Sequence, residues 1–326
     1  MKKNLSIKSL FYFPVLLFFL CYLLVFPQES LYAARAGLLL WFQTVLPTLF
    51  PFLVLSNLMI QTHAASYITY AVSPFLSKIF HVSSPGSYCI LCGFLFGYPM
   101  GAKTICDLHR LGEISTKEAS RLMLFCNHLS PMFLTGFVAA LLPFPASKSW
   151  VVVLIVFFSP ILGLMLSDLC SFVFFKDKND SSTAPEYFKK PSSSLPHLEK
   201  LRFSLIDASI FDAFETIVKL GGYIILFSIL SSIPLRIFPG HPAALALACV
   251  MEVTVGLSKL SASQLPLPIL FPGMMALCCF GGFSAFAQTA SFLQKENLSS
   301  LRYFKSKIVA AILAATMSVP LLHYTR

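Results

Sequence analysis

The stretch Tyr88–Ile105, YCILCGFLFGYPMGAKTI, decides how this chain folds. It is apolar enough for a lipid bilayer, yet Gly97, Pro99 and Gly101 interrupt it and Lys103 adds a charge. Irregular backbone at membrane depth persists only where it is packed in protein or lines a cavity. The stretch therefore predicts a re-entrant hairpin or a broken helix inside a membrane protein.

A second stretch of this kind, Leu270–Ala290, lies near the end of the chain. Gly281 and Gly282 permit an unwound backbone there, while Ser284 and Gln288 offer uncharged hydrogen-bonding groups. We expect a matching broken or re-entrant helix, with packing between helices as the alternative role of the small residues.

The composition assigns the rest of the chain to the same environment. Of its 326 residues, 56% are hydrophobic and 12% are charged, about half the roughly 25% charge of a soluble domain. The net charge of +10 is scattered in short stretches between apolar segments, which is typical of the positive-inside bias. The sequence therefore predicts an all-α integral membrane protein whose partner is the lipid bilayer, with no nucleic-acid binding.

Several segments reach the length of about 20 apolar residues that a transmembrane helix needs. The full-length ones are Leu10–Phe26, Gly37–Ile60, Glu118–Leu142, Trp150–Phe175, Ile217–Ile237 and Ser306–Leu322. Two weaker segments, Ala65–Phe80 and Ala243–Leu260, either cross the membrane or lie at its surface.

These segments divide the chain around one long polar interruption, Lys176–Arg202, which is rich in charge, Ser and Pro and has the composition of a flexible loop. Lys2, Lys3 and Lys8 place the N-terminus in the cytoplasm, and the loop with it. The predicted organisation is an uncleaved N-terminal transmembrane helix (1–34), a first repeat (35–145), a linking transmembrane helix (146–175), a flexible cytoplasmic loop (176–203) and a second repeat (204–326).

The two repeats are indicated by a weak internal similarity. GYPMGAKTI at Gly97–Ile105 aligns with GFSAFAQTA at Gly282–Ala290, and Lys103 then stands opposite Gln288. We expect an inverted repeat, a common design of secondary transporters. A parallel repeat, in which both weaker segments cross the membrane, is the alternative, because inversion places four basic residues outside the cell: Lys295, Arg302, Lys305 and Lys307.

The glycines and proline of the first motif suggest a binding role. Gly97, Pro99 and Gly101 are expected to break a helix, so that the following half-helix points its N-terminal N–H groups at a bound anion beside Lys103. A tight packing turn is the alternative. A nucleotide-binding P-loop is excluded, because Ala102 separates the Gly from the Lys.

A polar group interrupts the apolar span that follows. Pro131 removes a helical hydrogen bond and kinks the span, while Asn127 and Ser130 share one face. These two residues either face a substrate or bond between helices. His128 is either a proton carrier or a structural residue.

Glu252 is a carboxylate in an apolar segment, with Thr254 beside it. A charge at this depth is costly and typically functional, so we expect it to couple transport to protons or cations. The alternative is a solvated residue at the membrane surface.

No catalytic or metal-binding pattern is present: HExxH and GxSxG are absent, and Cys89 and Cys92 form a CxxC pair with no partner pair. We therefore expect no enzymatic activity, no cofactor and no metal.

Taken together, FPFLVLSNLM and the block FGYPMGAKTICDLHRLGEISTKEASRLMLFCNHLSPMFLTGFVAALL resemble the YlbJ-type sporulation integral membrane proteins. These carry the Gate, or nucleoside-recognition, domain. FDAFETIVKLGGYIILFSIL, MEVTVG and GGFSAFAQ extend the resemblance into the second half, so that it covers residues 35–320. The family's motif positions fall on Gly97, Pro99, Gly101, Lys103, Asn127, Pro131, Gly282 and Gln288.

The resemblance implies a polytopic helical bundle with two Gate-like repeats, and a role in endospore formation. It implies that the protein moves dipicolinic acid, a small organic anion, from the mother cell across the outer forespore membrane. A non-transporting scaffold of a sporulation assembly and a nucleoside-type permease are the alternatives. The sequence leaves open whether the chain forms a homo-oligomer.

The predicted substrate-binding residues combine the two motifs and the polar group. They are Gly97, Pro99, Gly101, Lys103, Asn127, Ser130, Pro131, Gly281, Gly282, Ser284 and Gln288. The coupling residues are Glu252, Thr254 and His128.

Overall fold

The computed structural model describes residues 7–174 and 200–325, and every regular element in these ranges is a helix. Five helices there are long and apolar enough to cross a bilayer. Their ranges are Pro27–Gln61, Ser149–Leu169, Phe203–Ile237, Leu267–Lys295 and Ser300–Leu322. The predicted class, an all-α polytopic membrane protein, is confirmed. Positions 176–199 of the predicted cytoplasmic loop lie outside the described residues.

The first long span, Pro27–Gln61, consists of two helices joined by a π-helical turn, and a separate helix precedes it. α1 (Ile7–Val25) is followed directly by α2 (Pro27–Leu40), in which Pro27 occupies the first turn, where a missing N–H costs no helical hydrogen bond. The π-helical turn Trp41–Val45 leads into α3 (Leu46–Gln61). The α2–α3 span is therefore continuous.

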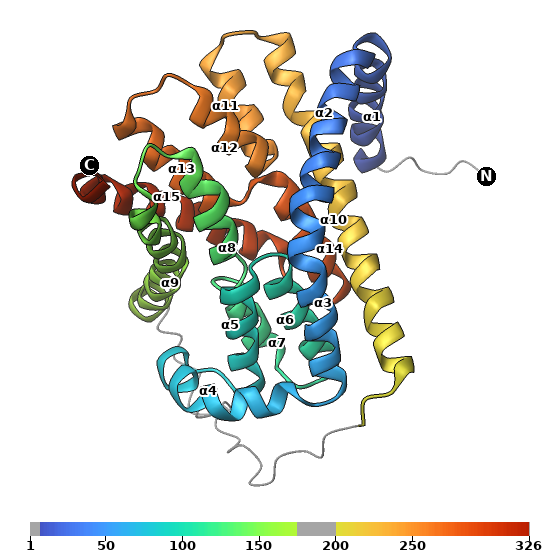
Figure 1. Cartoon of the computed structure of the whole chain (residues 1–326), viewed down its shortest axis with the longest axis vertical. Helices are drawn as coiled ribbons and strands as arrows, with labels where there is room; N and C mark the ends of the chain where they lie inside the picture. The colour runs from blue at the N-terminus through green and yellow to red at the C-terminus, as the bar shows by residue number, and fades with distance from the viewer. Residues whose placement is uncertain (1–6, 175–199, 326) are drawn as a thin grey trace.

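α10 (Phe203–Ile237) lies along the α2–α3 span, as Figure 1 shows. The indole N–H of Trp41 donates to the carbonyl oxygen of Ile217 at 2.8 Å. A Cβ atom on Gly221 would lie 2.7 Å from the Trp41 ring, so the absence of a side chain lets the ring pack against α10. These two long elements form one wall of the molecule.

The stretch Tyr88–Ile105 lies in a re-entrant hairpin. α5 (Ser84–Phe96) and α6 (Met100–Arg110) pack against each other, and the chain reverses at 97–99. A Cβ atom on Gly101 would lie only 3.2 Å from the Cα of Gly93. Glycine at both positions therefore lets the two helices approach closely.

The next span is broken where the hairpin tip meets it. It consists of α7 (Thr116–Leu122), an irregular segment at 123–130, and α8 (Pro131–Phe133) with its continuation to Leu141. The backbone N–H of Tyr98, in the hairpin tip, donates to the carbonyl oxygen of His128 at 2.7 Å. The segment predicted as one full-length span at 118–142 is therefore two shorter helical pieces with an unwound stretch before Pro131, and backbone groups of the hairpin bond to this stretch.

The second half contains a hairpin of the same kind. α11 (Pro242–Met251) and α12 (Val253–Ala262) are separated by Glu252 alone, and they pack against each other. The Cys249 thiol donates to the carbonyl oxygen of Gly256 at 3.5 Å. The weak segment predicted at 243–260 is this hairpin.

A second broken span follows it. α13 (Leu267–Phe280) and α14 (Gly282–Lys295) form one span that breaks at Gly281, whose φ is +82°. A Cβ atom on Gly282 would lie 3.1 Å from the backbone nitrogen of Val253. The tip of the second hairpin therefore packs on the break of this span, as in the first half.

Each half thus contains a hairpin, a broken span and an unbroken span, in that order. They are α5–α6, α7–α8 and α9 (Ser149–Phe174) in the first half, and α11–α12, α13–α14 and α15 (Ser300–Thr325) in the second. Figure 1 shows the α5–α6 hairpin toward the end of the molecule near α4 and the α11–α12 hairpin at the other end. This is the inverted arrangement expected from the sequence.

The motif alignment that suggested the repeat is, however, wrong. Gly97 and Gly282 both have positive φ, at +71° and +81°, and both precede a half-helix, which explains the local similarity. The chain reverses at Gly97 but continues across the break at Gly281. In the inverted repeat, the tip at 97–99 corresponds to Glu252, and the segment 123–130 corresponds to Gly281.

One end of the molecule, which we call the basic face, contains α4 (Ala65–Phe80), the α6–α7 turn and the α14–α15 turn. The His109 Nδ1 lies 3.5 Å from a carboxylate oxygen of Glu296, which brings the two turns together. Exposed basic residues on these turns and the adjoining helix ends include Arg110, Lys117, Lys295, Arg302 and Lys305. The positive-inside bias assigns this face to the cytoplasm. The basic residues around the α14–α15 turn are then cytoplasmic in the inverted arrangement, and the conflict noted for the inverted repeat disappears.

Candidate functional site

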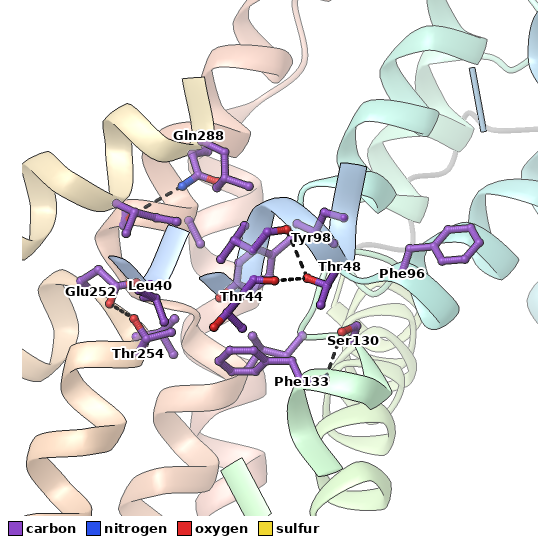
Figure 2. A pocket seen from close by; sticks show the side chains of 18 residues that line it. Leu40, Thr44, Thr48, Phe96, Tyr98, Ser130, Phe133, Glu252, Thr254 and Gln288 are labelled. Atoms are coloured by element: carbon purple, nitrogen blue, oxygen red, sulfur yellow. Dashed lines mark hydrogen bonds between the residues drawn. The ribbon is translucent and has the colours of Figure 1, made fainter. Parts of the chain in front are cut away.

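Both hairpin tips and both breaks meet at a central cavity, closed on one side by the α2–α3 span and α10. Figure 2 shows its lining, and about 70 Å³ is available to the centres of water-sized molecules. Its polar lining residues are Thr44, Thr48, Tyr98, Ser130, Glu252, Thr254, Ser284 and Gln288. Polar groups held by irregular backbone inside a membrane bundle are typical of a substrate site.

Three of the polar lining residues were not predicted from the sequence. Thr44 and Thr48 come from the π-helical turn and the start of α3, and Tyr98 comes from the first hairpin tip. The Thr48 hydroxyl donates to the carbonyl oxygen of Thr44 at 2.6 Å. The spacing of four residues beside Pro47 was the available signal, since it places two hydroxyls on one face of a bent helix.

The predicted residue Ser130 lines the cavity with its hydroxyl available. Its oxygen accepts from the backbone N–H of Phe133 at 3.3 Å and caps α8. Because the oxygen is used as an acceptor, the hydroxyl proton can be donated to a ligand.

Ser284 and Gln288 line the opposite wall, on the first turns of α14. The Nε2 of Gln288 lies 3.4 Å from the Ser284 hydroxyl, and Gln288 is 4% exposed. The Gln288 Oε1 has no hydrogen-bond partner among the described residues. The N-terminus of α14 also lacks a side-chain cap. A buried acceptor without a partner usually marks a ligand or water position.

Glu252 and Thr254 complete the lining at the second hairpin tip. The Glu252 Oε2 accepts from the backbone N–H of Val255 at 2.9 Å and from the Thr254 hydroxyl, and the carboxyl group thereby caps α12. Glu252 is 3% exposed. It is therefore a buried residue of the cavity rather than a solvated residue at the membrane surface.

Lys103, in contrast, does not line the cavity. Its ammonium lies 2.7 Å from Asp107, 2.8 Å from Asp212 and 3.0 Å from the Asn57 Oδ1. The Asn57 Nδ2 in turn donates to Asp212 at 2.6 Å. We call these four residues the Lys103 cluster. It ties α6 to α3 and α10, and two carboxylates already neutralise the charge that was expected to meet an anion.

Asn127 bonds between helices, which was the alternative to a substrate-facing role, and it does not line the cavity. Its Oδ1 accepts from the Ala102 N–H at 3.3 Å, and its Nδ2 donates to Thr289 at 3.0 Å and to the Tyr303 hydroxyl at 2.8 Å. The buried Lys307 ammonium donates to the Asn127 carbonyl oxygen. Asn127 therefore joins the first hairpin, the second broken span and α15, and its amide is fully engaged.

The remaining predicted residues shape the backbone around the cavity. Gly97 and Gly101 pack on the unwound segment, where Cβ atoms would lie 2.4 Å from the Ser130 nitrogen and 2.0 Å from the Cys126 oxygen, respectively. Pro99 follows a cis peptide bond in the first hairpin tip, and Pro131 begins α8. Gly281 and Gly282 form the second break.

His128 lies outside the cavity lining, in an apolar environment. Its ring centroid is 4.7 Å from that of Phe94 and 4.5 Å from that of Phe157. The Nδ1 lies 3.1 Å from the Leu129 carbonyl oxygen. These contacts favour the structural alternative for His128 over the proton carrier.

A larger open cavity of about 900 Å³, which we call the vestibule, lies between α2, α10 and α12. It begins near the Glu29–Arg236 ion pair, where the side-chain atoms are 3.3 Å apart, and includes the half-buried Lys259. Leu40 and Thr254 line both the vestibule and the central cavity. The vestibule therefore leads from the end opposite the basic face down to the central cavity, while the Lys103 cluster lies on the basic side.

Cysteine labelling should detect this one-sided access. Ser258 is exposed in the vestibule, whereas Ser209 of α10 is fully buried. We expect Ser258→Cys to react with a membrane-impermeant thiol reagent applied from the extracytoplasmic side and Ser209→Cys to stay unmodified, with wild type giving the background of exposed Cys21. Labelling of Ser258→Cys only from the cytoplasmic side would contradict the assigned orientation.

Re-entrant hairpins and broken spans around a mid-membrane polar cavity define a transporter-like integral membrane protein. Residues 42–146 match the model of the Gate family, described as nucleoside recognition. The chain is 26% identical over 340 residues to the sporulation integral membrane protein YlbJ of Bacillus subtilis (strain 168), an alignment that covers 96% of this chain and 82% of that protein. No solved structure matches the chain significantly. The resemblance inferred from the motifs is thus confirmed.

Proposed function

We propose that this protein is a sporulation-associated transporter that carries dipicolinic acid, a small organic anion, across the outer forespore membrane by alternating access. The observation that supports it is the central cavity, because both hairpin tips and both breaks contribute to it and a vestibule reaches it from one side. The similarity to YlbJ supports the link to sporulation. The binding step needs no catalytic group, so the proposal includes no enzymatic reaction.

The lining suits a planar ring that carries carboxylates. Phe96, Tyr98 and Phe133 offer aromatic surfaces that can stack on a flat ring. The hydroxyls of Ser130 and Ser284 accept bonds from protein groups and keep their protons for a ligand. The uncapped N-terminus of α14 favours negative charge.

A nucleoside-type permease is the second function that a specific finding favours, because the Gate family is described as nucleoside recognition. The aromatic lining would stack a base as readily as a pyridine ring. Nucleosides carry no carboxylate, so competition between the two compounds separates these functions.

The test is exchange of labelled dipicolinate in proteoliposomes loaded with unlabelled dipicolinate. We expect saturable exchange by wild type and about a 10- to 100-fold higher KM for Ser130→Ala combined with Ser284→Ala, because each hydroxyl would donate to a charged group, worth about 1.5–3 kcal/mol per bond before compensation by water. Ser306→Ala is the matched control, since its hydroxyl donates within α15 to the Tyr303 carbonyl oxygen and lies outside the cavity lining.

The outcomes separate the three functions. Exchange that nucleosides inhibit more strongly than dipicolinate would favour the permease. Folded wild-type protein without exchange of either compound would contradict transport and favour a scaffold.

A further inference from the structure

We propose that Glu252 is the protonation site that couples anion transport to proton movement, one proton accompanying the substrate in each cycle. This inference rests on the proposed function. Glu252 lies at the second hairpin tip, lines the central cavity and adjoins Thr254, which also lines the vestibule. Its carboxyl group can therefore meet both the bound substrate and protons that arrive through the vestibule.

Glu252 is the acidic residue of the central cavity. Every other polar lining residue is uncharged at neutral pH, and no basic side chain lines the cavity. An ionised Glu252 beside a bound carboxylate would repel it, and at about 4 Å and an effective dielectric constant of about 20 this weakens binding on the order of 1000-fold. An anion can share the cavity with Glu252 only if a cation or a proton accompanies it.

The nearby basic groups are bound by other residues or lie outside the central cavity. Lys103 is bound by two carboxylates, and Lys307 donates to the Asn127 carbonyl oxygen. Arg236 pairs with Glu29 in the vestibule. Lys259, on α12 itself, lines the vestibule and not the central cavity. No basic side chain of the cavity is thus left to neutralise the pair of carboxyl groups, and we assign this role to a proton that enters with the substrate.

The neighbouring elements present uncharged groups to the cavity around Glu252. The first hairpin presents the Tyr98 phenol, α14 presents Ser284 and Gln288, and the α2–α3 span presents Thr44 and Thr48. Tyr98 is the titratable member of this group, and its phenol is neutral at physiological pH. No charged residue of these elements lines the cavity to fix the ionisation of Glu252.

One carboxyl oxygen accepts the hydrogen bonds that cap α12, and we place the proton on the other oxygen. Oε2 is held by the Val255 N–H and the Thr254 hydroxyl at the start of α12. Protonated at Oε1, the group donates a hydrogen bond to a substrate carboxylate, and this acid–carboxylate bond is stronger than one between neutral groups. The proton is taken up from water at one face and released at the other, and no covalent bond of the substrate changes.

The experiment compares two assays on the same proteoliposomes, with the membrane potential clamped at zero. Dipicolinate exchange reports binding and conformational change, and accumulation driven by an imposed pH gradient reports coupling. For wild type we expect about a tenfold accumulation per pH unit, as one co-transported proton requires. Glu252→Gln should lose the accumulation driven by the pH gradient, and the exchange that it retains should no longer depend on pH.

Glu296→Gln is the matched control, because Glu296 lies on the basic face beside His109 and should leave accumulation unchanged. If Glu252→Gln does not fold, proton uptake by wild type on addition of dipicolinate, followed with a pH-sensitive dye, measures the coupling directly. Glu252→Asp, which keeps a titratable group, should retain accumulation.

Three results have distinct meanings. Wild-type exchange without a response to the pH gradient would overturn the coupling and leave the proposed function standing. Accumulation driven by a sodium gradient at constant pH would also overturn it, because a metal cation would then neutralise Glu252. Absence of wild-type exchange would instead contradict the proposed function itself.

Discussion

Replacement of Gly101 by alanine is expected to prevent the protein from reaching its folded state in the membrane. The added Cβ atom would lie 2.0 Å from the carbonyl oxygen of Cys126, on the unwound segment of the first broken span. That oxygen belongs to backbone, so no flexible side chain can move away. Overpacking against a rigid neighbour costs typically 1–3 kcal/mol and sometimes more, and here the first hairpin must separate from the break to relieve it.

The measurement is the yield of monodisperse protein in detergent and its thermal midpoint. Gly222→Ala is the matched control, because a Cβ atom there would have no neighbour within 4 Å and the position lies within a helix. Alanine favours a helix over glycine, so this variant should be neutral or slightly stabilising. Equal behaviour of the two variants would mean that the hairpin does not dock on the break as described.

Replacement of Lys103 by alanine is expected to destabilise the protein by about 2–3 kcal/mol. Removing one partner of a buried ion pair costs typically 3–5 kcal/mol. The expected loss is smaller here, because the Asp212 side chain is 46% exposed and Arg110 still pairs with Asp107 at 2.6 Å. Transport should fall as well, since the Lys103 cluster holds α6 against α3 and α10.

A double-mutant cycle identifies the cause of this loss. If the Lys103 cluster is structural, Lys103→Ala combined with Asp212→Asn should recover part of the stability, because the uncompensated carboxylate is gone. If Lys103 were the countercharge of a substrate, the second change would not help and KM would rise without loss of stability. Lys219→Ala breaks the exposed pair with Glu215 and serves as the control, with an expected change below about 0.5 kcal/mol.

The fold was predictable from the sequence to the level of which segments lie in the membrane and which of them are irregular. Apolar length identifies the spans, and clustered Gly and Pro identify the stretches around Gly97 and Gly281. Whether a chain reverses or continues at such a glycine depends on what packs beside it. In the first stretch, close packing between Gly93 and Gly101 lets the chain fold back as a hairpin. In the second stretch, the tip of the other hairpin packs on Gly282, and the chain continues as a broken span. That contact is tertiary, and it is why the motif alignment was wrong.

The candidate site was predictable in part for a related reason. Ser130, Glu252, Thr254, Ser284 and Gln288 were all singled out, because polar residues in apolar segments are costly unless they have partners. The same rule also selected Lys103 and Asn127, whose partners are other parts of the protein. The sequence gives the depth of a polar residue but not the direction of its side chain.

The vestibule also determines how this protein experiences the membrane voltage. Filled with water from the extracytoplasmic side, the vestibule would bring the electrical potential of that solution down to Leu40 and Thr254. The voltage then falls over the packed layer between the central cavity and the basic face, where each charge moved is worth about 2.3 kcal/mol per 100 mV. In this conformation a charged substrate that enters the vestibule crosses little of the transmembrane electric field. The electrical work is then concentrated in the step that opens the cytoplasmic side.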